Sequence, residues 1–180
     1  MASVIESMID AGVNSFKIEG RMRSIYYIAT ILHTYRQIFD KISTNSLTSE
    51  YIDYATNIIN RVANRESVCQ FYHSLPGVEE QYYNGRREES NQDFLGLVLG
   101  YNDDYITLEV RNNFKKGTKV QIFGPTMEEI EFDIEEILDE NGDEKEVCNH
   151  PKEIVKIRCP YKCEKYAMIR VKVFDKYTGL

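Results

Sequence analysis

The stretch "DFLGLVLGYNDDYITLEV", residues 93–110, decides the fold class of this chain. Two apolar segments flank the cluster "YNDDY", whose Asn and Asp residues are typical of a tight turn, so the stretch predicts a β-hairpin. Further short strands are expected around it: "SVCQFYHS" (67–74), "KVQIFG" (119–124), "EIEFDIEEIL" (129–138), "EIVKIRC" (153–159) and "YAMIRVKVF" (166–174). Six or seven short strands in about a hundred residues predict a small closed or nearly closed β-barrel.

The residues before this barrel predict helices and one short strand. "SVIESMIDAG" (3–12) has one apolar face, and "SFKIE" (15–19) alternates apolar with charged residues as a strand does. Ser24 is a candidate N-cap for an amphipathic helix, whose expected inward residues are Ile28, Ile31, Leu32, Tyr35 and Ile38. A polar stretch then leads into a third helix within 49–65. The chain is therefore predicted to be α+β, with parts at 1–43, 44–66 (linker and helix) and 67–180 (β-barrel).

Composition and charge exclude several classes of protein. The chain has 180 residues, of which 42% are hydrophobic and 28% charged, and it has no apolar run of membrane-spanning length. Its first ten residues contain acids and no basic residue, unlike a secretory signal, so a cytoplasmic protein with no membrane partner is expected. The net charge is −7, and residues 91–180 carry 13 basic against 18 acidic residues. Any contact with RNA must therefore be local.

The four cysteines give no metal-binding pattern. Cys69, Cys148, Cys159 and Cys163 are irregularly spaced, and only "CPYKC" (159–163) brings two of them close together in sequence. A structural zinc site normally pairs two such motifs, and the sequence holds no second one. Two incidental thiols on a loop between strands are therefore expected, with no metal site. The alternative is a metal site that includes His150 of "CNHPKE" (148–153).

Several segments resemble peptidase family U32, which contains collagenase-like proteases (hydrolases) and tRNA uridine 5-hydroxylation proteins. In the first part of the chain the resemblance rests on "SFKIEGRMRS" (15–24) and "YYIATILHTYRQIFD" (26–40). In the second part it rests, in this order, on "DFLGLVLGY" (93–101), "LEVRNNFKKGTKVQIFGP" (108–125) and "NHPKEIVKIRC" (149–159). The chain departs from the family at Asn64 and Arg65, where the family often has His-Arg, and in the stretch that follows.

The resemblance implies a fold and a context. Residues 1–43 would be the terminal helix-strand-helix of a (β/α) TIM-type barrel, and the later residues a C-terminal β-barrel of translation-factor style. The chain would then be the C-terminal part of a longer protein, with the N-terminal barrel of that parent as a partner. The family's cysteine-rich segment, linked to activity or to an iron–sulfur cluster, would lie upstream, so no cofactor is expected in this chain.

Two groups of residues are candidates for function. In a (β/α) barrel the carboxyl ends of the strands carry the active site, so Lys17, Glu19 and Arg21 are candidate catalytic residues in the context of the parent protein. Their alternative role is a structural ion pair at the barrel rim. The second group surrounds a turn of the barrel and could bind nucleic acid, with cations for phosphate and an aromatic ring for a base: Arg111, Phe114, Lys115, Lys116 and Lys119. Alternatively, Phe114 fills the barrel and the cations only make the hairpin soluble.

Three hypotheses about function remain open. The chain could be the C-terminal part of a collagenase-like protease, inactive alone, whose barrel recognises RNA or a protein or peptide substrate. It could instead belong to a tRNA uridine 5-hydroxylation protein and serve as its tRNA-binding module. The third hypothesis is a stand-alone barrel protein without enzymatic activity. Self-association into a homo-oligomer is expected to be feasible, because the "SFKIE" strand edge and an apolar helix face would be exposed.

Overall fold

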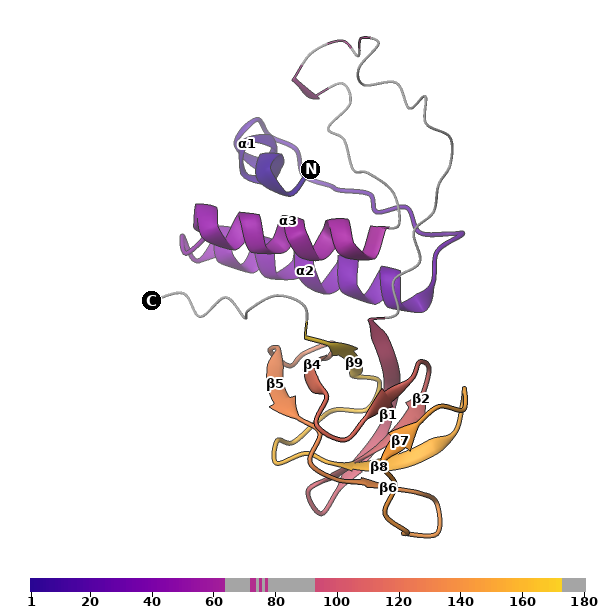
Figure 1. Cartoon of the computed structure of the whole chain (residues 1–180). Coiled ribbons are helices and arrows are strands. Elements are labelled where there is room, and N and C mark those ends of the chain that lie inside the picture. The colour runs from indigo at the N-terminus through magenta and orange to yellow at the C-terminus, as the bar shows by residue number, and fades with distance from the viewer. Residues whose placement is uncertain (64–71, 74, 76, 78–92, 173–180) are drawn as a thin grey trace. The chain divides into compact units, whose positions relative to one another are not determined.

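The structure is a computed structural model that describes residues 1–63, 72, 73, 75, 77 and 93–172. The chain divides into two compact units. The described residues up to 77 belong to the first unit, and residues 93–172 belong to the second. The first unit is helical and the second is a β-structure (Figure 1).

The first unit contains the short 3-10 helix η1 (Ala2–Val4) and the α-helices α1 (Ile5–Asp10), α2 (Ile25–Ser43) and α3 (Ser49–Ala63). The predicted N-cap of α2 is confirmed, because the Ser24 hydroxyl accepts a hydrogen bond from the Tyr27 backbone N–H at 3.2 Å. Helices α2 and α3 run side by side (Figure 1) and share a core of buried residues: Ala2, Ile5, Ile38, Tyr51 and Ala55. Leu32, predicted to face inward, is 51% exposed, because the buried face of α2 follows Ile31, Thr34 and Ile38 instead.

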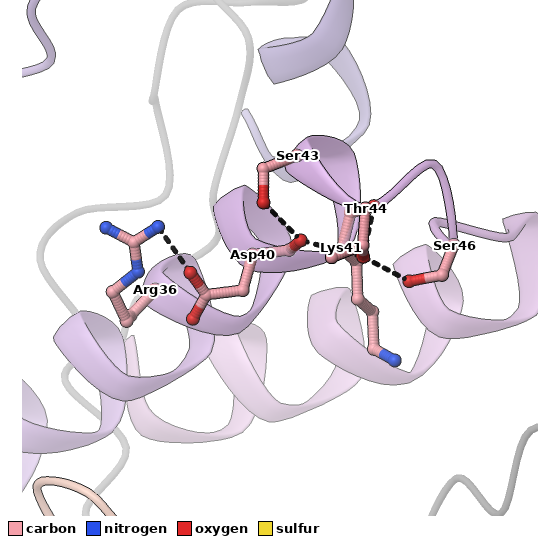
Figure 2. A network of polar contacts seen from close by, with 6 residues as sticks. All are labelled: Arg36, Asp40, Lys41, Ser43, Thr44 and Ser46. Carbon is pink, nitrogen blue, oxygen red and sulfur yellow. Dashed lines mark hydrogen bonds and ion pairs between the residues drawn. The ribbon is translucent and has the colours of Figure 1, made fainter.

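Side-chain hydroxyl groups form hydrogen bonds at the C-terminal end of α2 (Figure 2). The hydroxyls of Ser43 and Thr44 donate to the Asp40 carbonyl oxygen, at 2.7 and 2.9 Å, and Thr44 also bonds with the Ser46 hydroxyl at 2.8 Å. One turn earlier, Arg36 forms an exposed ion pair with the Asp40 carboxylate at 2.6 Å. The Asp40 carbonyl oxygen also accepts from the Thr44 backbone N–H at 3.1 Å, so the two hydroxyls add to the backbone bond that ends the helix.

The strand predicted over residues 15–19 is not formed, which corrects one element of the expected helix-strand-helix. Residues 13–20 have no regular secondary structure, and Lys17, Ile18 and Glu19 are exposed. A strand needs a neighbour for its backbone hydrogen bonds, and every strand that the structure describes lies in the second unit. Phe16 nevertheless packs against Phe39 of α2, with ring centroids 5.1 Å apart.

The second unit is a curled antiparallel sheet (Figure 1). Its strands are β1 (Phe94–Asn102), β2 (Tyr105–Val110), β3 (Phe114–Lys115), β4 (Lys119–Phe123), β5 (Ile130–Asp133), β6 (Ile137–Leu138), β7 (Val147–Cys148), β8 (Ile154–Arg158) and β9 (Met168–Val171). Seven of them form one sheet in the order β5-β4-β9-β1-β2-β8-β6, and β3 pairs with β7. The predicted hairpin over 93–110 is confirmed as β1 and β2.

The α+β class is confirmed, and the expected barrel takes the form of a half-barrel. In the described part of the chain, β5 and β6 are the two edges of the seven-stranded sheet and do not pair with each other. The concave side holds one apolar core, to which β1, β2, β4, β8 and β9 all contribute. The strand expected at 67–74 lies mostly outside the described residues.

Strand β9 lies between β1 and β4, with β1 as its neighbour on one side and β4 on the other.

The close packing of β1 against β2 requires Gly96, because a Cβ atom there would lie 2.7 Å from the Glu109 carbonyl oxygen and 2.7 Å from Leu108 Cγ. Both distances are too short for a real side chain, so any larger residue would push β1 away from β2.

A buried polar network lies on β9, β4 and the segment before β5. The Arg170 guanidinium pairs with Glu129 at 2.6 Å and donates to the Gln121 side-chain oxygen at 3.0 Å. Arg170, Glu129 and Gln121 are 4%, 6% and 1% exposed. A charge removed from water in this way is tolerated only when it is paired and hydrogen-bonded.

We expect Arg170→Met to lower the free energy of unfolding by about 3–5 kcal/mol, because it leaves the Glu129 carboxylate buried without its cation. The double variant Arg170→Met with Glu129→Met should recover most of that loss. Denaturant unfolding followed by circular dichroism measures both. Arg36→Met is the matched control, because the Arg36–Asp40 pair is exposed and is worth less than about 1 kcal/mol. Equal losses in Arg170→Met and the control would contradict the prediction.

Candidate nucleic-acid interface

The three candidate catalytic residues of the first unit lie on an exposed irregular segment. Lys17, Glu19 and Arg21 are all exposed. The Glu19 carboxylate accepts a hydrogen bond from the Arg21 backbone N–H at 2.9 Å, which is a local turn contact. Among the described residues no ion pair joins these three side chains to one another. Their catalytic role in a larger protein therefore stays a prediction.

The basic residues predicted to bind nucleic acid surround β3 and the start of β4, and two of them are already paired. Arg111 forms an ion pair with Glu109. Lys116 pairs with Glu144 at 2.5 Å and lies 3.8 Å from a Glu146 oxygen. The hydrogen bond that the Lys116 ammonium donates to the Glu144 carboxylate is the main cause that raises the pKa of Lys116. A phosphate that approached either cation would have to compete with these carboxylates.

Lys115 and Lys119 differ from Arg111 and Lys116 in their contacts with carboxylates. Both are exposed, and the described part of the chain places no carboxylate in an ion pair with them. They stand at the start and end of the turn between β3 and β4, where Gly117 has a φ of 82°. Of the predicted cluster, these two ammonium groups are the ones able to meet an anion without breaking an ion pair.

Phe114 lies in the core and offers no face to a base. Its side chain is 3% exposed and belongs to the apolar cluster of the sheet. Its neighbour across the β3–β7 pair is Cys148, which is also fully buried. This position corrects the expectation of an exposed ring, and the alternative that Phe114 fills the half-barrel is the one observed.

The two cysteines of "CPYKC" meet in the connection between β8 and β9. The Sγ atoms of Cys159 and Cys163 are 3.6 Å apart, and both thiols point at the Tyr161 carbonyl oxygen, at 3.4 and 3.2 Å. The hydrogen bond between the thiols lowers the pKa of Cys159 and raises that of Cys163, because a thiolate at 159 would be stabilised by the proton on 163. The described residues contain no group of three or more His, Cys, Asp or Glu side chains placed to hold a metal ion.

The sequence analysis missed two exposed tyrosines in this connection. Tyr161 is 45% exposed and Tyr166 is 58% exposed, with Lys162 and Lys165 also exposed beside them. The Lys165 Nζ atom lies 5.1 Å from the centre of the Tyr166 ring. The signal is present in "CPYKCEKY" (159–166), where a Tyr-Lys pair precedes Cys163 and a Lys-Tyr pair follows Glu164.

Comparison with known families matches both units. The model for the peptidase family U32 matches residues 1–82, and the model for the peptidase family U32 C-terminal domain matches residues 90–170. The chain belongs to peptidase family U32. The resemblance in the sequence is thereby confirmed along nearly the whole chain, in the order that the family has.

Curated relatives of this U32 chain carry names from tRNA modification. The tRNA hydroxylation protein P1 of Bacillus subtilis is 38% identical over 172 residues, which are 92% of this chain and 40% of that protein. The tRNA hydroxylation protein P of Haemophilus influenzae is 28% identical over 142 residues, 77% of this chain and 30% of that protein. The U32 chain thus spans less than half the length of these relatives.

A solved structure matches about half of this chain. It is the crystal structure of the C-terminal domain of a Geobacillus thermoleovorans protein described as a U32 peptidase, which is 37% identical to this chain. The match covers 47% of this chain and 98% of that domain, with a TM-score of 0.45. In this U32 chain, none of the helices that the structure describes combines the length and the hydropathy needed to cross a bilayer.

We expect Cys148 to resist iodoacetamide in the native chain at about pH 8, because burial raises its pKa to about 12 and the thiolate is the reactive form. A rise from the ordinary value of 9.0 reduces the thiolate about a thousandfold. Peptide mass spectrometry after timed labelling measures the rate, and labelling in guanidinium gives the unfolded control. A native rate close to the unfolded one would show that the β3–β7 pair, and Phe114 with it, is open.

Proposed function

We propose that this chain is part of a tRNA hydroxylation protein and that its second unit contacts the tRNA substrate. The observation that carries the proposal is the 38% identity to tRNA hydroxylation protein P1 over 92% of the chain. The names of the other curated relatives found point the same way. The protease alternative is supported by the name of the family and by the description of the solved domain as part of a U32 peptidase, and no group of described residues favours peptide cleavage.

The chemistry of hydroxylation is assigned, in this proposal, to parts of the protein outside this chain. The described residues hold no metal-binding cluster, and the candidate residues Lys17, Glu19 and Arg21 lie exposed on an irregular segment. The iron–sulfur cluster that the family resemblance implies would likewise be held elsewhere in the protein. The chain alone is then a substrate-binding part without activity, located where tRNA is, in the cytoplasm.

The charge of the chain limits how the tRNA contact can work. With a net charge of −7, the chain as a whole repels the phosphate backbone. Attraction must come from single exposed cations, such as Lys115 and Lys119, with which no carboxylate of the described residues forms an ion pair. Such a contact involves few phosphates, so it is weak and its salt dependence is shallow compared with that of a strongly basic protein.

We expect the chain to bind an unmodified tRNA transcript in fluorescence anisotropy at low salt. Two or three phosphate contacts should make the affinity fall by about 10- to 40-fold between 50 and 200 mM salt. Duplex DNA of similar length is the control for unspecific charge attraction and should bind less tightly. Absence of tRNA binding at the lowest salt would contradict the proposal, and cleavage of gelatin by the purified chain would favour the protease alternative.

A further inference from the structure

We propose that Tyr161, Lys162, Lys165 and Tyr166 form a binding surface for unpaired RNA nucleotides. These four residues, here called the tyrosine-lysine loop, lie in the connection between β8 and β9. The inference rests on the proposed function, since it takes tRNA as the ligand, and it names where the tRNA is held and by which chemistry. It differs from the cluster around β3 and β4, whose aromatic ring is buried.

The two tyrosines supply the stacking surfaces. Within residues 93–172, Tyr161 and Tyr166 are the aromatic side chains that stand out as exposed, at 45% and 58%. Exposed aromatic rings are what proteins use to stack the bases of single strands, and each stacked base contributes about 5- to 150-fold in affinity. Bases inside a duplex are not available for such stacking, so the ligand is an unpaired region such as a tRNA loop.

The two lysines supply positive charge that no ion pair neutralises in the described part of the chain. Lys162 and Lys165 are exposed, and no carboxylate of the described residues forms an ion pair with either. The one acid within the loop is Glu164, and its carboxylate accepts bonds from the Thr126 backbone N–H and hydroxyl, at 2.7 and 2.9 Å, and from the Met127 N–H at 3.1 Å. Lys165 stands 5.1 Å from the Tyr166 ring centre, where it can meet the phosphate of a stacked nucleotide.

The loop is held at both of its ends by the β1–β2 hairpin. The Cys159 N–H donates to the Asp104 carbonyl oxygen at 2.7 Å, and the Tyr166 N–H donates to the Val98 carbonyl oxygen at 2.8 Å. Tyr166 has a φ of 73°, which is uncommon for a residue other than glycine and persists only when the surroundings impose it.

The middle of the loop is fixed as well. Both buried thiols contact the Tyr161 carbonyl oxygen. Gly124 leaves room for Glu164, because a Cβ atom at 124 would lie 2.3 Å from the Glu164 carboxylate. A surface held in place before binding loses little entropy when a ligand arrives.

Substitutions in the full chain test the surface by anisotropy with an unmodified tRNA transcript. Tyr161→Ala with Tyr166→Ala should weaken binding at least about 25-fold. The matched pair Tyr161→Phe with Tyr166→Phe keeps both rings and should stay within about twofold. Lys162→Gln with Lys165→Gln should weaken binding and reduce the salt slope by about two, whereas Lys115→Gln with Lys119→Gln should change affinity less than the loop lysines do.

The form of the ligand gives a second test. A single-stranded RNA of about 12 nucleotides should compete with tRNA, and the same sequence in a duplex should compete poorly. Cross-linking of wild-type chain to RNA containing 4-thiouridine should label the tryptic peptides with Tyr161 or Tyr166, a result that needs no variant to fold.

The outcomes separate this inference from the proposed function. Wild-type binding to tRNA that the Tyr→Ala pair leaves unchanged, or cross-links confined to other peptides, would overturn the tyrosine-lysine loop and leave the proposed function standing. No binding by wild type at low salt would overturn both. Thermal melts of every variant identify a loss of binding that comes from unfolding, and in that case the cross-linking result decides.

Discussion

The backbone hydrogen bonds of β9 hold the second unit together. This strand is last among those described, yet it lies between β1 and β4 and pairs with both. Without it the sheet would separate into β5–β4 and β1-β2-β8-β6, which share no other ladder among the described strands. Because β8 ends on one side of the β1–β2 hairpin and β9 returns on the other, the connection between them must cross the hairpin. The position of Tyr161 and Tyr166 is thus a consequence of strand order.

Pairing of charges within the second unit decides which cations can act on a ligand. Lys116 and Lys145 are held by carboxylates at the surface, and Arg170 and Lys172 are held by Glu129 and Glu131. In the described part of the chain, these pairs leave a small set of exposed lysines with no ion pair to a carboxylate, although acidic residues outnumber basic ones in the whole sequence. The net negative charge of the chain therefore repels nucleic acid at long range, whereas these few lysines are the groups able to pair with a phosphate at short range.

Local patterns in the sequence predicted the α2 cap and the β1–β2 turn. Long-range strand pairing determined which strands form, their order and the burial of Phe114. The cap at Ser24 and the turn "YNDDY" depend on neighbouring residues only, so both were predictable. The "SFKIE" segment has the alternation of a strand, but that alternation cannot provide a pairing partner. Phe114 could be placed inside or outside only once β3 was known to pair with β7. Strand order, with β9 in the middle, has no local signal at all.

The motif "CPYKC" has a structural role in the connection between β8 and β9. Its two thiols do not make a zinc site pattern, and within the described residues no third ligand joins them. Their contribution is mechanical: two small buried side chains, 3.6 Å apart, turn the chain so that the residues between and after them face outward. Tyr166 takes its unusual φ where Val98 holds the backbone on both sides, because the Tyr166 N–H donates to the Val98 carbonyl oxygen and the Ala167 carbonyl oxygen accepts from the Val98 N–H, both at 2.8 Å. The buried cysteines thus help to fix the loop that carries the exposed side chains of Tyr161 and Tyr166.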